Sequence, residues 1–244
     1  MILMPFLSAG ISGYFAYLVS RQYTERGKEH QLIWAVSLWL AAAGSLAYGV
    51  AVTSGSAIFF RIFYLSGAVF MAALLGVGSC YLAFGPRVGR ISLVAVAALG
   101  LLVSGAVMGS PINNAALADL AVSVGSGRGV LRLTGLAAAG RTLLNIFGTV
   151  AVAGVAIKSA IDVGKRQAPR NFLHGNLLIA GGVVANAVAG AMARLGTGFD
   201  PFWLLMTLGW VLMFLGFARI GKGLVPARRS AQPAAVSRSS ASSS

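Results

Sequence analysis

Charged side chains are scarce in this sequence. Asp, Glu, Lys and Arg make up 10% of the 244 residues, hydrophobic residues make up 57%, and the mean hydropathy is +0.83. A soluble domain usually carries about 25% charged residues, which it needs on the surface that faces water. This composition excludes a water-soluble enzyme and a soluble DNA-binding domain. It also excludes a disordered chain, because the apolar surface available for burial is ample.

Acidic residues are the rarest charged type, with five Asp and Glu against 19 Lys and Arg, for a net charge of +14. None of the five lies inside a long apolar run. Because proton-driven pumps and carriers generally need carboxylates within the membrane, we do not expect proton coupling. The basic residues lie in short breaks between apolar runs, which is typical of the loops of membrane proteins. No nucleic acid is therefore expected as a partner.

Motifs that carry catalysis or bind cofactors are also missing. The single cysteine, Cys80, can form neither an intramolecular disulfide nor a zinc site. There is no phosphate-binding glycine loop, nucleophile elbow or metalloprotease helix, so we expect neither an enzyme nor a cofactor. His30 and His174 flank two apolar runs and could ligate haem or a metal. A metal site needs more ligands than these two, and hydrogen bonds to lipid headgroups or helix ends explain them as well.

What the sequence has in abundance is long apolar runs. A membrane-spanning helix needs about 20 mostly apolar residues, and in lipid such a run must be helical to pair its backbone groups. We predict an all-α bundle of seven transmembrane helices in one domain over residues 1–225. The tail, residues 226–244, is rich in Ser and Ala and is predicted to be disordered in the cytoplasm. The predicted helices cover residues 2–19, 31–52, 58–84, 91–109, 136–157, 175–193 and 201–220.

The distribution of basic residues predicts how the chain is oriented. Most of the 19 Lys and Arg lie in the breaks after the first, third, fifth and seventh runs. Cytoplasmic loops of membrane proteins carry an excess of Lys and Arg. We therefore predict a multi-pass protein of the cell membrane, with its N-terminus outside and its C-terminus in the cytoplasm.

A weak internal repeat relates the first three predicted helices to the last three. A shift of 142 positions places Phe60 on Phe202, Gly67 on Gly209 and Met71 on Met213. The fourth helix then stands alone as a linker. Parallel repeats of this kind occur in transporters, with the binding site between the repeats. The layout resembles the three-plus-one-plus-three plan of the sugar-carrier and PQ-loop group, although no helix contains the Pro-Gln dipeptide that marks many of its members.

Four short motifs carry a second resemblance, over most of the chain except the tail. They are FRIFYLSGA at 60–68, GNLLIAGG at 175–182, ARLG at 193–196 and LMFLGF at 212–217. With these motifs the chain resembles a group of uncharacterised seven-helix membrane proteins from actinobacteria and related bacteria. The resemblance implies the same fold and brings no activity with it.

Small and aromatic residues predict how the helices pack and where they meet the interface. Gly182, Asn186 and Gly190 stand four apart on one face, and Gly105 and Gly109 form a second such pair. Faces of this type let helices approach closely in lipid, so we expect packing within the bundle. Tryptophans are predicted to anchor helix ends at the membrane interface, namely Trp34, Trp39, Trp203 and Trp210.

A cluster of basic and amide side chains is the strongest candidate site. Arg141 lies six residues into the fifth helix, about 9 Å below the outer edge at 1.5 Å per residue. Charges at such depth usually face a cavity or a polar partner. Asn145 lies one turn deeper on the same face, Asn186 lies in the sixth helix, and Arg61 and Arg194 lie at outer helix ends. These five residues predict an outward-facing pocket for an anion.

Two further explanations of these arginines stay open. Long basic side chains can extend to the lipid headgroups, or they can pair with Asp119 or Asp200. We therefore expect a carrier or binding protein for a small anionic solute, with the lipid bilayer as its surroundings. The alternative is a non-transporting sensor or accessory subunit, which would act on a membrane or cytoplasmic protein partner because the chain has no output module.

Overall fold

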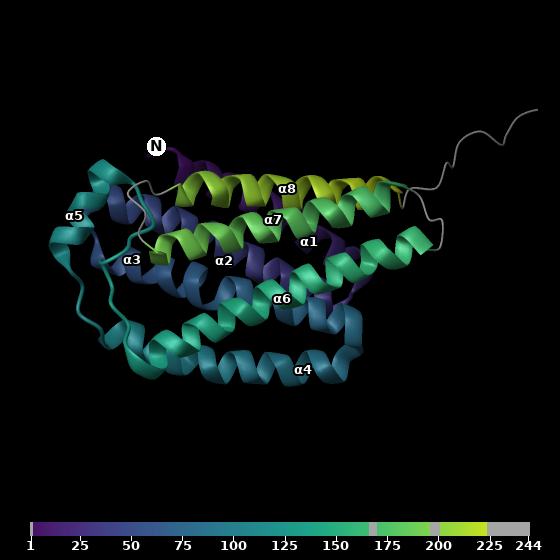
Figure 1. Ribbon diagram of the computed structural model, residues 1–244, viewed down its shortest axis with the longest axis horizontal. Helices are drawn as coiled ribbons and strands as arrows, with labels where there is room; N and C mark the ends of the chain where they lie inside the picture. Colours follow the sequence, from purple (N-terminus) through teal and green to yellow (C-terminus); the bar gives the residue numbers. More distant parts are fainter. Residues whose placement is uncertain (1, 166–169, 196–200, 224–244) are drawn as a thin grey trace, which may run out of the picture.

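The computed structural model describes residues 2–165, 170–195 and 201–223, and it is an all-α bundle, as predicted (Figure 1). In these ranges no β-strand is present apart from one isolated bridge between Ile112 and Leu131. The segment η1 is a π-helix, and the other elements are α-helices. The elements are α1 (Met4–Arg26), α2 (Glu29–Ser54), α3 (Ala57–Phe63), η1 (Tyr64–Met71), α4 (Ala72–Gly109), α5 (Asn114–Ser123), α6 (Gly135–Lys165), α7 (Arg170–Leu195) and α8 (Phe202–Gly223).

Two predicted helices, 58–84 and 91–109, belong to one continuous stretch from α3 through η1 to α4. The chain doubles back within α4, where Gly85 has φ 84° and ψ 179° and Pro86 follows (Figure 1). Glycine tolerates this backbone conformation without strain, and proline cannot continue the hydrogen bonding of a helix. The reversal therefore needs no loop, and it divides α4 into two antiparallel halves.

The helices have the length and surface of membrane-spanning segments. Five segments are long and apolar enough to cross a membrane, namely Glu29–Ser54, Ala57–Gly109, Gly135–Asp162, Arg170–Ala193 and Phe202–Gly221. The second contains the reversal at Gly85, and α1 is not among the five, so seven crossings stay a prediction. Large apolar side chains such as Leu102, which is 74% exposed, cover the outside of the bundle. Such a surface is unfavourable in water, and it is that of an integral membrane protein.

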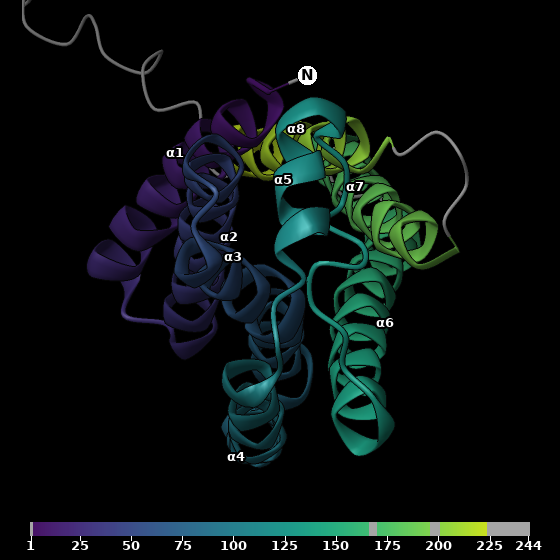
Figure 2. The same cartoon turned by 90° about the vertical axis from the view of Figure 1, so that its left-hand side faces the viewer.

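Six neighbouring contacts close the bundle into a ring around a central space. Along the chain, α1 packs on α2, α2 on α3, η1 and α4, α4 on α6, α6 on α7, and α7 on α8. Contacts between α8 and α1 complete the ring, which Figure 2 shows from its α5 end. The contact of α6 with η1 and α4 corresponds to that of α1 with α8. This order of neighbours is the one that the predicted repeat requires.

Glycine contacts support the same correspondence. A Cβ atom at Gly44 would lie 3.3 Å from the backbone nitrogen of Gly67, and a Cβ atom at Gly209 would overlap Oδ1 of Asn186. The two pairs are related by the shift of 142. A Cβ atom at Gly182 would lie 2.5 Å from the carbonyl oxygen of Gly209. The predicted packing of Gly182 and Asn186 within the bundle is therefore confirmed.

The corresponding prediction for the second pair of glycines is wrong within the described part of the chain. Apart from its chain neighbours and its own helix backbone, no described atom lies within 4 Å of a Cβ atom built at Gly105 or Gly109. The reason is geometric: this face of the second half of α4 points away from the other helices. Spacing of small residues thus identified a packing face in α7 but not in α4.

A folded connection, residues 110–134, covers one end of the ring. The segment lies between two predicted helices, and it contains α5, whose first turn is capped by Asn113 Oδ1 accepting from Ala116 N at 3.1 Å. The Tyr48 hydroxyl and the Trp203 indole both donate to the carbonyl of Gly125, the latter at 3.2 Å. Side chains from α2 and α8 therefore hold the connection over the end of the bundle.

Two of the four tryptophans predicted at the membrane interface are instead in the core. Trp203 is 3% exposed and Trp210 is fully buried. Trp203 is held inside by its bond to Gly125 and by its ring contact with Tyr48, 4.6 Å between centroids. The interface prediction is wrong for these two residues, because proximity to a helix end does not say which way a ring points.

The connections rich in basic residues gather at the end opposite α5. The break after α1, the reversal at Gly85, the end of α6 and the end of α8 all lie there (Figure 1). Arg90 and Glu29 form an ion pair across this end, with 3.4 Å between Nη2 and Oε1. The predicted tail over 226–244, Asp200 and the side chain of Arg194 lie outside the described residues.

Candidate ligand-binding cavity

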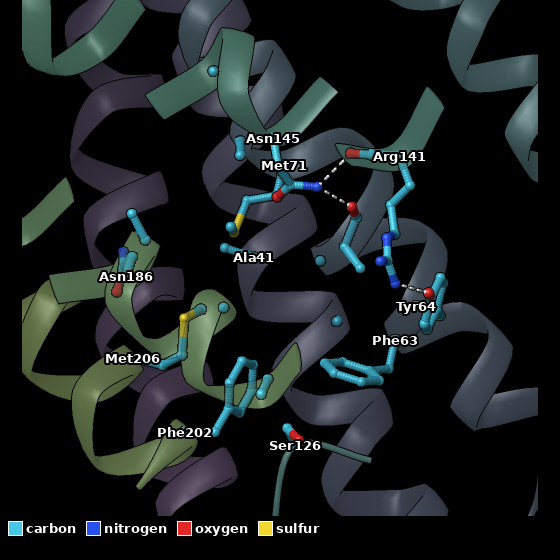
Figure 3. A pocket seen from close by; sticks show the side chains of 18 of the residues that line it. Ala41, Phe63, Tyr64, Met71, Ser126, Arg141, Asn145, Asn186, Phe202 and Met206 are labelled. Carbon is cyan, nitrogen blue, oxygen red and sulfur yellow. Dashed lines mark hydrogen bonds between the residues drawn. The ribbon is translucent and has the colours of Figure 1, made fainter. Parts of the chain in front are cut away.

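A cavity of about 770 Å³ lies inside the ring, toward the α5 end. Its walls come from α2, η1 and the start of α4, α6, α7 and α8, and the connection after α5 closes one side (Figure 3). Binding pockets for small molecules usually measure about 300–1,000 Å³. The volume is therefore sufficient for an organic molecule and is larger than an inorganic ion needs.

The charged side chains among the described residues of the cavity wall are all arginines. Arg128 and Arg132 come from the connection after α5, and Arg141 comes from α6. Neither Asp nor Glu is present among the described residues that line the cavity; Asp200 lies outside the described part of the chain. None of the three arginines forms an ion pair with a carboxylate in the described part of the chain. With apolar walls of low dielectric, these charges create a positive potential inside the cavity.

Arg141 points to the interior of the ring. Its Nη1 donates to the hydroxyl of Tyr64 on η1, and its Cζ atom lies 5.8 Å from the centroid of the Tyr64 ring (Figure 3). A guanidinium group has five N–H donors, and no described residue accepts a bond from the others. The structure thus favours neither extension to lipid headgroups nor pairing with Asp119, two explanations left open above. Its role in binding stays a prediction.

Asn145 joins α6 to the π-helical segment. Its Nδ2 donates to the carbonyl of Ala68 at 2.7 Å and to the carbonyl of Arg141, one turn earlier, at 2.9 Å (Figure 3). Both hydrogen atoms of the amide group are used by these bonds. Asn145 therefore lies on the cavity wall mainly as a link between helices.

Asn186 lies on the opposite side of the cavity from Arg141 (Figure 3). Its Nδ2 is 3.9 Å from the sulfur of Met213, and its Oδ1 is buried without a hydrogen-bond partner among the described residues. That oxygen packs against Gly209 of α8. The structure thus brings Arg141, Asn145 and Asn186 to one cavity.

Arg61 does not join them. Its Nη1 donates to the carbonyl of Val107 and its Nη2 to that of Ser110 at 2.7 Å. These carbonyls lie at the end of α4, where the backbone lacks helical partners and a cation is favourable. Arg61 is therefore placed as a helix-capping residue outside the cavity lining.

The two histidines considered as ligands are not placed in a common site. His30 packs against Trp34 of its own helix, with 5.2 Å between ring centroids, and His174 is exposed on α7. Among the residues that the structure describes, no group of three or more His, Cys, Asp or Glu is arranged to hold a metal ion.

The π-helical segment η1 forms one wall of the cavity and was not predicted from the sequence. Its Ala68 carbonyl accepts from Asn145, and its Met71 carbonyl accepts from the Ser37 hydroxyl of α2 at 2.5 Å. Side chains from two neighbouring helices thus satisfy backbone groups of this segment. Short π-helical segments occur frequently at functional sites.

Arg128 and Arg132 were also missed as site residues. Their signal was available, since they are basic residues on the side of the membrane that is otherwise poor in them. They precede α6 in an irregular segment, so helical periodicity could not place them on the same face as Arg141. Only the folding of residues 110–134 over the bundle brings them to the cavity.

Comparisons with known proteins find no matching family model, no matching curated protein and no matching solved structure. The fold and the cavity define a membrane-type helical bundle with a central cavity. Its function is therefore argued from the chemistry of the cavity wall.

Proposed function

We propose that the protein binds small organic anions in this cavity, as a carrier or binding protein of the cell membrane. The observation that carries the proposal is the charge of the wall, where Arg128, Arg132 and Arg141 have no acidic counterpart among the described lining residues. Arg141 is half-buried, and removing part of a guanidinium from water without a carboxylate costs free energy that a bound anion would offset. A carboxylate or phosphate group would supply that partner through charge-assisted hydrogen bonds.

The predicted orientation makes the cavity face outward. If the ends rich in basic residues lie in the cytoplasm, the α5 end and the three arginines lie near the outer surface. An anion from outside would meet Arg128 and Arg132 first, since both are exposed, and then the half-buried Arg141.

Pairs of wall residues support a carrier over an accessory subunit. Residues of α2 and η1 on the wall correspond, by the shift of 142, to wall residues of α7 and α8. A site shared by two repeats is typical of carriers that alternate between two openings. The corresponding pairs are Ala41 and Val183, Gly44 and Asn186, Ser45 and Ala187, Tyr64 and Met206, and Met71 and Met213.

Binding can be tested with phenyl phosphate and the neutral benzyl alcohol as probes. Phenyl phosphate is expected to raise the thermal unfolding midpoint of the purified protein, because a ligand that binds only the folded state stabilises it. Arg141→Ala should abolish this shift, and Arg141→Lys should weaken it because lysine lacks the planar fork. Arg87→Ala is the matched control, since Arg87 is exposed at the opposite end of the bundle.

Two results would contradict the proposal. One is an equal shift with benzyl alcohol, and the other is an unchanged phenyl phosphate shift in Arg141→Ala. Uptake of radiolabelled phenyl phosphate into proteoliposomes then separates the two classes. If the protein is a carrier, its proteoliposomes accumulate the label and those with Arg141→Ala do not. A sensor or accessory subunit binds the probe without uptake.

A further inference from the structure

The cavity changes in character along the helix axes. Its arginines lie at the α5 end, whereas its deeper wall consists of apolar residues such as Leu75, Val152, Val183 and Met213. Arg141 and Val152 both line it and are eleven residues apart on α6, a separation of about 16 Å at 1.5 Å per residue. A molecule that fills the cavity would therefore place a charged group at one end and an apolar part at the other.

Polar side chains are few on the wall between these ends. Both hydrogen atoms of the Asn145 amide are bonded to carbonyl groups, and the Asn186 oxygen is packed on Gly209. A solute rich in hydroxyl groups would leave many of its own polar groups unpaired in this part, which costs free energy for each group. The wall thus disfavours a sugar, which the resemblance in layout would suggest.

The cavity also reaches the lipid-facing side of α6. Ile146 and Val150 line it and yet are 54% and 65% exposed. They belong to the exposed apolar stripe of α6, which continues through Leu143 and Ile157. Figures 1 and 2 show α6 and α7 farther apart at the α5 end than at the other end. Because the exposed residues Ile146 and Val150 also line the cavity, its side opening toward the lipid lies at this face of α6.

We propose that the ligand is an amphipathic organic anion that enters from the bilayer through this side opening. Its acidic headgroup pairs with Arg141, Arg132 and Arg128, and its apolar chain lies along the deeper wall. This inference rests on the proposed function of the same cavity. The apolar chain of the ligand stays in apolar surroundings throughout entry. Selectivity over free lipid therefore comes from the pairing of the headgroup with arginine.

Trp203 lines the cavity and provides a reporter. The protein is placed in phosphatidylcholine nanodiscs, and quenching of its tryptophan fluorescence by bromododecyl phosphate is measured. We expect saturable quenching that is weakened tenfold or more in Arg141→Gln, because a charged hydrogen bond contributes about 1.5–3 kcal/mol. Arg87→Gln, at the opposite end, should bind as the unmodified chain does. Neutral bromododecanol should give only unsaturable quenching.

Competitors identify the source of the headgroup and separate the two proposals. Displacement by dioleoyl phosphatidate indicates a membrane lipid, and displacement by dodecyl phosphate alone indicates a free single-chain anion; both support the inference. Full displacement by inorganic phosphate, or binding of phenyl phosphate without saturable quenching by the bromoalkyl probe, overturns the amphipathic ligand and leaves anion binding intact. Saturable quenching by bromododecanol, or no binding of any anion, overturns both.

Discussion

Two arginines near the same end of the bundle have different roles because their neighbours differ. Arg61 donates to carbonyls at the end of α4, whereas Arg141 meets the Tyr64 hydroxyl beside the cavity. The sequence shows both as isolated charges next to apolar runs. It predicts that each needs a polar partner, but the choice between a helix end and a cavity depends on tertiary contacts. For this reason the sequence could not show that Arg141 lines the cavity whereas Arg61 binds carbonyls at the end of α4.

Glycines show the same dependence on neighbours, and they give a prediction at this scale. A Cβ atom at Gly148 of α6 would overlap the carbonyl of Ala72, whereas nothing lies within 4 Å at Gly154 of the same helix. Gly148→Ala should lower the free energy of unfolding by about 1–3 kcal/mol through overpacking. Gly154→Ala should leave it unchanged or raise it by up to about 1 kcal/mol. Unfolding in a denaturing detergent series measures both, and equal stability of the two variants would contradict the close contact of α4 and α6.

Among the elements, the long helices were predictable and the irregular ones were not. Each predicted apolar run coincides with a helix or a part of one, because a run of that length has one favourable conformation in lipid. The reversal at Gly85 was visible only as a gap between 84 and 91. The π-helix η1 has no signature in hydropathy, and α5 is too short and too polar to be detected as a span. The π-helix η1 depends on side chains from other helices, namely Asn145 and Ser37.

The bond from Asn145 to η1 gives a prediction at the scale of the element. Asn145→Ala should destabilise the protein by about 0.6–1.7 kcal/mol, the range for polar bonds between membrane helices. It should also increase hydrogen–deuterium exchange over Tyr64–Met71. The control is Asn176→Ala on α7, whose amide donates to Phe172 of its own helix at 2.9 Å. If the two variants exchange equally over η1, Asn145 does not hold this segment.

At the scale of the whole molecule, the ring of helices, its cavity and the predicted membrane orientation are connected. The ring follows from helix contacts, and the grouping of basic connections at one end follows from the alternation of the helices. The sequence predicted an all-α bundle and the concentration of basic residues in every second connection. It could not predict that residues 110–134 fold back over the cavity, because that depends on Tyr48 and Trp203 meeting the carbonyl of Gly125. The outward-facing, anion-attracting cavity is the claim that unites these features.

Thiol-reactive ions added outside intact cells test that claim most directly. Cys80, buried and free, is first replaced by alanine, and Thr149→Cys then places a thiol on the cavity wall. Thr53→Cys, exposed at the same end of the bundle and absent from the cavity wall, is the matched control. The rates of a sulfonate-bearing and a trimethylammonium-bearing methanethiosulfonate are compared at each position, which cancels differences in thiol reactivity.

The account predicts that the ratio of anionic to cationic reagent rates is higher at position 149 than at position 53 by about tenfold, the lower range of electrostatic focusing. Adding Arg141→Gln should bring the two ratios close together. Equal ratios at positions 149 and 53 in protein that keeps Arg141 would contradict a positive potential in the cavity. Reaction at position 149 only from the cytoplasmic side would contradict its outward orientation.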